Sequence, residues 1–459
     1  SMTSLLGFLM LVGTVVNNGI LYVDTVNQYR REMDLNTALV EAGDSGCITE
    51  LQIISRSYGA AAGSLGSVLC STGIFISVLA QVVACSGLTI TLFPHIPVWA
   101  AALASIIIMC FYVIFGGAWG AGMGGIVKLV LLYAASLVGM VYALSVSHGI
   151  GGIFSELIEQ LCGTGLGLVQ QSANGVSNLK DTADLADRYG NLVARGAMKD
   201  IGSGLSLMLG VLSTQTYAQA VLSAESDRKA KRGALLSAML IPPLGIAGIC
   251  IGLFMRSHYM LQAEAETLKA AGMAIPDLPV LTSTIQVFPA FVLDYMPPLL
   301  AGIALGTLLI TSVGGGAGLS LGMATILIKD IYQRMTTKRM DEKKELAATR
   351  GILGAILVTA ACVASLVPGS TINDLGFLSM GLRGSVVLVP MSCALWLKYD
   401  INKRWVLTAI VLAPAAVLVG KLLALPIDSL YLGILVSVLC CCAGGIMGRE
   451  PGKRRICDD

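Results

Sequence analysis

The stretch "TSVGGGAGLSLGMATILIKDIY", from Thr311 to Tyr332, decides the fold class. It is apolar over a length that can cross the roughly 30 Å hydrocarbon core of a bilayer. It also carries three consecutive glycines, which are unfavourable in an isolated helix. In lipid, small residues instead let neighbouring helices approach closely. The stretch therefore predicts a membrane helix that packs tightly against its neighbours and ends near Lys329 and Asp330.

The composition of the whole chain agrees with a membrane protein. Of the 459 residues, 55% are hydrophobic and only 13% are charged. A soluble domain cannot hide so much apolar surface. The net charge of +2 gives no indication of a nucleic-acid partner. We therefore expect an all-α polytopic membrane protein whose surroundings are the lipid bilayer.

About eleven apolar stretches have a length suited to a membrane span, which sets the expected number of transmembrane helices. They cover residues 1–23, 62–93, 97–117, 122–145, 200–222, 233–256, 298–329, 351–368, 375–397, 405–424 and 430–447. The stretch 62–93 is longer than a span needs, so it is expected to tilt or to extend beyond the bilayer.

Basic residues predict the orientation of these spans, because cytoplasmic loops are enriched in lysine and arginine. Every second loop is basic, and the loops between them carry more acid, including Glu264, Glu266 and Asp277. The basic loops hold Arg228, Lys229, Lys231, Arg232, Arg334, Lys338, Arg339, Lys343, Lys344, Arg350, Lys398, Lys403 and Arg404. The alternation predicts a multi-pass protein of the inner (cytoplasmic) membrane, with segment 146–199 outside and carrying a short helix.

Metal, redox and enzyme chemistry find no support in the residue pattern. The 12 cysteines lie mostly inside apolar runs, where they act as small hydrophobic residues, and no CxxC pair occurs. The three histidines, His95, His148 and His258, lie near predicted helix ends. No nucleophile–base arrangement and no phosphate-binding loop is visible. We expect no enzyme, no metal site and no cofactor, and the sequence gives no indication of the oligomeric state.

The N-terminal segment has a resemblance of its own. Residues 13–31, "GTVVNNGILYVDTVNQYRR", resemble a membrane helix of the resistance-nodulation-division efflux pumps, and the likeness continues to Gly43. Those pumps also use carboxylates on another helix and large periplasmic domains, which have no counterpart here. Asn17 and Asp24 are polar groups in lipid, normally a functional sign, but they lack these relay partners. Residues 1–45 are therefore interpreted as an efflux-pump-like helix with an amphipathic extension.

The rest of the chain resembles the sodium/solute symporter family. Five segments carry the likeness, in the expected order over some 400 residues. They are "ITELQIISRSYG" (48–59), "GGAWGAGMGGIVKLVLL" (116–132), "TQTYAQAVLSAESDRKAKRG" (214–233), "MATILIKDIY" (323–332) and "FLSMGLRGSVVLVPMSCALWLK" (377–398). Residues 46–459 are accordingly interpreted as a symporter-like transmembrane core.

This resemblance implies a five-plus-five inverted repeat like that of the leucine transporter, with a solute site mid-membrane at broken helices. By the same alignment the first two core helices are missing and the pump-like helix stands in their place. The apolar start at Ser1 likewise predicts a fragment. A fusion, a rearranged gene and an assembly error each explain this pattern.

The implied function is secondary active transport, the symport of a small polar solute with a cation. The altered ion site would make this transport sodium-independent, and the altered N-terminus would leave the chain inactive as given. Two alternatives remain open: an efflux-pump fragment carrying an unrelated membrane domain, and a non-transporting membrane sensor with a transporter-like core. The solute itself is not predicted, because this scaffold serves many substrates.

The glycine run falls where the resemblance implies an ion site. Counting back from Asp330, the hydroxyl ligands of sodium would stand at Gly314 and Gly315, with a backbone contact at Thr311. Glycine supplies no hydroxyl, so Thr311, Ser312 and Ser320 are the nearest replacements. The alternative is that the run serves only as a small-residue packing face.

Lys128 marks a second departure from the family pattern. Where relatives often carry Thr-Asp, this chain has Gly124-Gly125, and Lys128 follows one helical turn later. A buried ammonium in lipid costs a few kcal/mol unless it is paired or reaches the surface. Some relatives of the fold that use no sodium place a lysine amine at its site, so Lys128 is a candidate for that role, with H+ in place of Na+ as coupling ion. Alternatively, the side chain snorkels to the cytoplasmic surface.

Polar side chains within the predicted spans are candidates for solute contacts. They are Gln81 on the stretch 62–93 and Gln215, Tyr217 and Gln219 on the stretch 200–222. Amide and phenol groups in lipid need hydrogen-bond partners, which either a solute or a neighbouring helix can supply. The family usually has Gln-Arg where Gln219-Ala220 stand here, so the resemblance does not carry over a substrate class.

Overall fold

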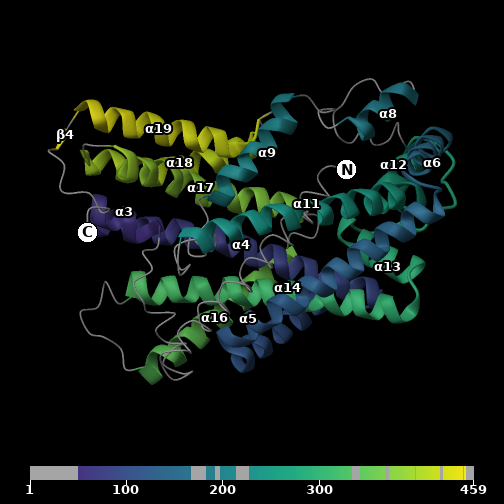
Figure 1. The fold of residues 1–459 in the computed structure, drawn as a ribbon, viewed down its shortest axis with the longest axis horizontal. Helices are drawn as coiled ribbons and strands as arrows, with labels where there is room; N and C mark the ends of the chain where they lie inside the picture. Colours follow the sequence, from purple (N-terminus) through teal and green to yellow (C-terminus); the bar gives the residue numbers. More distant parts are fainter. Residues whose placement is uncertain are drawn as a thin grey trace.

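The fold is seen in a computed structural model that describes residues 50–166, 182–191, 197–212, 227–332, 342–366, 372–397, 400–423, 427–447 and 449–450. Within these residues the chain is almost entirely helical (Figure 1). The predicted span 1–23 and the efflux-pump-like segment 1–45 lie outside the described residues. The proposed boundary near residue 46 and the two missing core helices therefore stay predictions.

The helices follow one another with short connections. Their bounds are α3 Glu50–Tyr58, α4 Ala60–Leu92, α5 Val98–Val146, α6 Ile150–Gly163, α8 Thr182–Gly190, α9 Ala197–Leu212, α11 Asp227–His258, α12 Gln262–Ala270, η1 Thr284–Gln286, α13 Val287–Tyr295, α14 Pro298–Ile326, η2 Leu327–Tyr332, α16 Glu342–Leu366, α17 Ile372–Trp396, α18 Lys403–Leu422 and α19 Ser429–Met447. Strand β1 (Met260–Leu261) pairs in parallel with β2 (Val280–Leu281), and β3 (Asp400–Ile401) pairs antiparallel with β4 (Arg449–Glu450).

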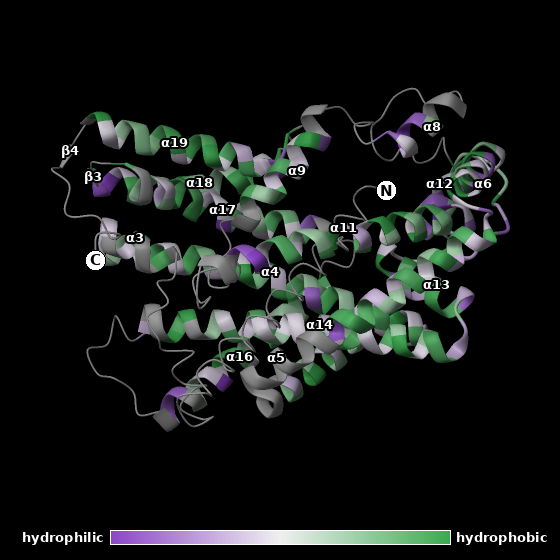
Figure 2. Cartoon of the chain, viewed as in Figure 1, coloured by the Kyte–Doolittle hydropathy of each residue, from purple (hydrophilic) through white to green (hydrophobic). Residues whose placement is uncertain are grey.

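Eight helices in the described part of the chain are long and apolar enough to cross a membrane. They correspond to eight of the predicted spans, and Figure 2 shows hydrophobic residues running along them. The predicted span 97–117 corresponds to a shorter apolar segment, Val98–Tyr112. The span 200–222 is covered only by α9, which ends at Leu212 before residues that the structure does not describe.

Helix α5 combines two of the predicted spans and turns back on itself. Its bounds run unbroken from Val98 to Val146. The ammonium of Lys128 nevertheless lies 3.3 Å from the hydroxyl of Tyr112, 16 residues earlier. In a straight helix those residues would stand about 24 Å apart, more than two side chains can bridge. The chain therefore bends sharply between them, which agrees with separate spans at 97–117 and 122–145.

The two ends of the bundle differ in charge and structure. Helices α6, α12 and α13 gather at one end, whereas β3 and β4 lie at the other (Figures 1 and 2). Acidic Glu264 and Glu266 belong to α12, whereas Lys403 begins α18 directly after β3. This separation fits the predicted alternation of loops. Segment 146–199 holds two described helices, α6 and α8, rather than the single short helix expected.

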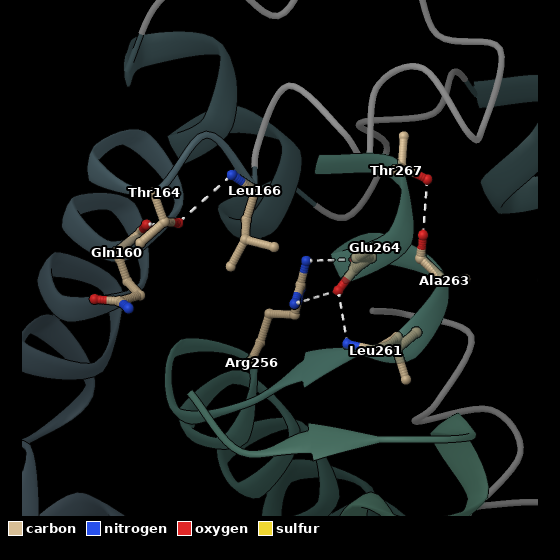
Figure 3. Close-up of polar contacts among 8 residues, drawn as sticks. All are labelled: Gln160, Thr164, Leu166, Arg256, Leu261, Ala263, Glu264 and Thr267. Atoms are coloured by element: carbon tan, nitrogen blue, oxygen red, sulfur yellow. Dashed lines mark hydrogen bonds and ion pairs between the residues drawn. The ribbon is translucent and has the colours of Figure 1, made fainter. Parts of the chain in front are cut away.

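A buried ion pair fixes the chain at the α12 end (Figure 3). The Arg256 guanidinium donates to both carboxylate oxygens of Glu264, at 2.8 and 3.3 Å. The same carboxylate accepts the backbone N–H of Leu261 at 3.0 Å. Burial raises the pKa of the neighbouring Tyr259 to about 12. These contacts tie the end of α11 to α12.

Helix α4 occupies the middle of the bundle and packs against α14, α17 and α5. Its glycines allow this crowding. A Cβ added at Gly87 would lie 2.2 Å from the Ile285 side chain, and one added at Gly73 would lie 2.6 Å from Cγ of Arg383. Side chains from distant parts of the sequence thus fill the space that each glycine leaves, and α4 meets the glycine run of α14.

Candidate solute and ion site

The glycine run of α14 meets α4 and α5 near the middle of its length. A Cβ added at Gly314 would lie 2.1 Å from Nζ of Lys128, and 3.6 Å from the Tyr112 hydroxyl. Lys128 donates to that hydroxyl at 3.3 Å, and its ammonium stands 5.2 Å from the centre of the Tyr112 ring. The missing side chain of Gly314 therefore makes the space in which the ammonium lies.

Lys128 is enclosed by protein. Only 5% of the residue is exposed, although a lysine that snorkels keeps its charged end in water. Its neighbours, the Tyr112 hydroxyl and ring, interact favourably with a cation. The structure thus differs from the snorkelling alternative and brings two predicted site residues, Lys128 and Gly314, into direct contact.

The next two glycines, Gly315 and Gly316, lie against other side chains. A Cβ added at Gly315 would lie 3.2 Å from Oε1 of Gln81, and one added at Gly316 would lie 2.8 Å from the sulfur of Met109. Each glycine of the run therefore makes room for a different side chain, one from α4 and two from α5. The run therefore packs closely against α4 and α5, and two of the three packed side chains, Lys128 and Gln81, are polar.

Two buried oxygen atoms beside this meeting point have no hydrogen-bond partner among the residues described. They are Oε1 of Gln81 and Oγ1 of Thr311, which stands one helical turn before Gly315. Gln81 is 5% exposed and Thr311 is fully buried. An unsatisfied buried acceptor costs about 1–3 kcal/mol, so such atoms are normally paired by something. Two acceptors and one ammonium can together hold a polar solute.

The remaining predicted ion ligands lie on the same helix. Ser312 is buried on α14. The Ser320 hydroxyl donates to the backbone oxygen of Gly316 at 2.6 Å and so serves its own helix. Within the described residues no group of three or more histidine, cysteine or acidic side chains could hold a metal ion.

The predicted solute contacts on the stretch 200–222 cannot be placed. Gln215, Tyr217 and Gln219 lie outside the described residues. Of the four predicted solute ligands, Gln81 alone is therefore located, and it lies beside Gly315. The roles assigned to all four stay predictions.

Arg383 is a further buried cation, besides Lys128 and the paired Arg256, and it is not among the predicted site residues. It lies on α17 and is 6% exposed. Its guanidinium donates through Nη2 to the hydroxyls of Ser77 and Ser379, at 3.2 and 3.0 Å. The signal was visible in the sequence, because Arg383 is the one charged residue within the predicted span 375–397. A charge inside a membrane span is costly and usually functional, as for Lys128.

Solved structures show which fold this arrangement belongs to. A Na+-coupled sialic acid symporter, in its substrate-bound outward-open state, matches with a TM-score of 0.60 at 14% identity, over 98% of this chain and 87% of that one. The manganese transporter of Eremococcus coleocola matches with a TM-score of 0.40 at 14% identity, over 98% and 81%. The first likeness confirms the leucine-transporter-like fold expected from the sequence.

The sequence comparisons address the family. No curated protein matches significantly. A model of the sodium:solute symporter family matches residues 7–403, which begins inside the segment that resembles an efflux-pump helix. That pump resemblance stays unconfirmed, and nothing found supports the efflux-pump alternative. The protein is a multi-pass secondary active transporter that couples a small-molecule solute to a cation, and the chain belongs to the sodium:solute symporter family.

Proposed function

We propose that this chain carries a small polar solute across the cytoplasmic membrane, chemically unchanged, and that H+ replaces Na+ as the coupling cation. One observation carries the proposal: the Lys128 ammonium lies in the space left by Gly314. That position is where the family resemblance implies a sodium ligand. A covalently attached positive charge thus stands where a mobile one would bind.

Electrostatics disfavours sodium beside this lysine. Two unit charges about 4 Å apart repel by about 4 kcal/mol at the effective dielectric of a protein interior. Gly314 and Gly315 also lack the hydroxyl oxygens that a hard cation prefers. A lysine can instead lose its charge by releasing a proton, so its protonation can alternate during a transport cycle.

The solute is proposed to bind beside the lysine. Oε1 of Gln81 and Oγ1 of Thr311 are acceptors that the described residues leave unpaired. Hydroxyl or amine hydrogens of a solute would satisfy both of them. Broken or glycine-rich helices near the bilayer midplane are the usual place for such a site.

A test of the coupling ion needs no knowledge of the solute. The purified protein in nanodiscs would be assayed for ²²Na+ binding, and for thermal stability in sodium chloride against choline chloride at several pH values. Lys128→Met removes the charge at similar length. Lys421→Met is the matched control, because Lys421 is an exposed lysine paired with Asp374 at 3.3 Å.

We expect the wild-type protein to show no sodium-specific stabilisation and a stability that varies with pH. Lys128→Met should bind more sodium, because the repulsion is gone, and should lose part of the pH dependence. The Lys421→Met variant should behave like the wild type. Sodium binding and sodium-dependent stabilisation of the wild type, without pH dependence, would exclude the proposal.

A further inference from the structure

A second buried cation at mid-membrane calls for a role of its own. Arg383 lies near the middle of the span Asp374–Ala394 on α17. Charged side chains at that depth are costly and usually functional. The proposed coupling role of Lys128 does not use Arg383, which lies on another helix.

The guanidinium lies within a small group of hydrogen-bonding atoms. Besides the two serine hydroxyls, its Nε donates to the backbone oxygen of Ser379 at 3.2 Å. The hydroxyls of Ser77 and Ser379 are themselves 2.6 Å apart. Gly73 lets the stem of Arg383 lie directly against α4, since a Cβ there would meet its Cγ at 2.6 Å. Arg383 is thus held with a guanidinium and two hydroxyls close together.

One face of α4 connects this group with the lysine site. Gly73, Ser77 and Gln81 recur every four residues, so they lie on one side of the helix. Ser77 contacts Arg383 from α17, and Gln81 lies against the glycine run of α14 that also receives Lys128. Ser77 and Gln81 are about 6 Å apart along the helix axis, the length of a small solute. Arg383 therefore borders this face of α4 at Gly73 and Ser77, and Gln81 at its other end contacts Gly315, the residue next to the one that meets Lys128.

We propose that the transported solute is a carboxylate anion whose charged group is bound by Arg383 together with the hydroxyls of Ser77 and Ser379. Arginine presents paired N–H donors in a plane that matches the two oxygens of a carboxylate. The Ser77 hydroxyl can rotate to donate to the same group. The Ser379 hydroxyl donates to the backbone oxygen of Gly73 and would exchange that bond for one to the carboxylate. The polar remainder of the solute then reaches Gln81 and Thr311. This inference rests on the proposed transport function.

The structural alternative is that Arg383 only ties α17 to α4. Ligand selectivity separates the two roles, because a purely structural arginine would not distinguish acids from amides. The full chain in nanodiscs would be screened by thermal shift against small carboxylates, each paired with its primary amide. The pairs include lactate and lactamide, nicotinate and nicotinamide, and proline and prolinamide.

We expect stabilisation by one or more acids and by none of the amides. Arg383→Gln should weaken acid binding by about ten- to a hundredfold, the range for hydrogen bonds to a charged group. Arg383→Lys should retain part of it, because it keeps the charge but loses the planar pair of donors. Lys421→Gln, which removes an exposed cation near α17, should bind like the wild type.

Several results would overturn the inference: stabilisation by an amide as strong as by its acid, no acid that stabilises the wild type, or unchanged acid binding in Arg383→Gln. If Arg383→Gln does not fold, Ser77→Ala and Ser379→Ala provide the test, because both variants keep the arginine. Each should weaken acid binding severalfold, and unchanged acid binding in both would contradict the inference. Binding of a neutral solute without sodium would contradict the carboxylate inference but not the coupling proposal. Sodium binding by the wild type would contradict the coupling proposal but not the carboxylate inference.

Discussion

At the scale of single residues, two glycines on different helices each leave the space that a buried cationic side chain occupies. Gly314 leaves space for the ammonium of Lys128, and Gly73 leaves space for the stem of Arg383. Without these glycines each long side chain would have to move or the helices would separate. Glycine in these helices therefore positions charge as well as allowing close packing.

Gly314→Ala tests this positioning. Its added methyl group would take the place of Nζ, which is the free end of a flexible side chain, so we expect Lys128 to move while the fold survives. The helix itself gains up to about 1 kcal/mol from replacing glycine. Reaction of Lys128 with a small membrane-permeant amine reagent, read by mass spectrometry, should become faster.

The control for that variant lies on the same helix. A Cβ at Gly318 meets nothing within 4 Å, so Gly318→Ala should leave the labelling of Lys128 unchanged. Equal labelling of Lys128 in the Gly314→Ala variant and the wild type would show that the position of the ammonium does not depend on the space beside Gly314.

At the scale of helices, α17, α18 and α19 come together around a single glycine. A Cβ at Gly433 on α19 would lie 2.5 Å from Val417, 2.8 Å from Ser385 and 3.0 Å from the backbone oxygen of Ala413. Two of these atoms belong to α18 and the third to α17. Because a backbone oxygen cannot swing away as the end of a long side chain can, this crossing tolerates no added atom.

We expect Gly433→Ala to destabilise the bundle by about 1–3 kcal/mol, the usual cost of overpacking. Thermal unfolding in nanodiscs would measure it as a lower midpoint. Gly354→Ala on α16 is the control, because nothing lies within 4 Å of its added Cβ. A midpoint for Gly433→Ala equal to that of the control would mean that the three helices are less tightly packed than described.

At the scale of the whole molecule, the two ends of the bundle are held by different means. One end is joined by the β3–β4 pairing, which connects the start of α18 to the chain after α19. The other is held by the buried pair Arg256 and Glu264 (Figure 3). Breaking a buried pair by removing one partner leaves an uncompensated charge, which is more costly than losing a surface pair.

Glu264→Gln should therefore loosen the α12 end selectively. We expect a loss of about 3–5 kcal/mol where the pair is broken. Amide hydrogen exchange should become faster over residues 256–270 and stay unchanged around α18 and α19. Asp374→Asn, which breaks the exposed pair with Lys421, should cost less than about 1 kcal/mol. Uniformly faster exchange throughout the molecule would contradict a local role for the pair.

The sequence by itself determined the class of protein and most of its helices. Hydropathy is a property of contiguous residues, so eight predicted spans correspond to helices that could cross a membrane. The family resemblance selected Lys128, Gly314 and Gly315 together, and the structure places them at one meeting point. Arg383 is also visible in the sequence, as a charge within a predicted membrane span.

Only the tertiary structure decided which side chain fills each gap. Gly314 receives Lys128 and Gly73 receives Arg383, residues that lie far away along the chain. The burial of Lys128, the sharp bend within α5 and the contact of Arg383 with α4 likewise depend on segments that are distant in the sequence. A sequence pattern reports what each helix presents along its own length. Which helix it meets is set by the packing of the whole bundle.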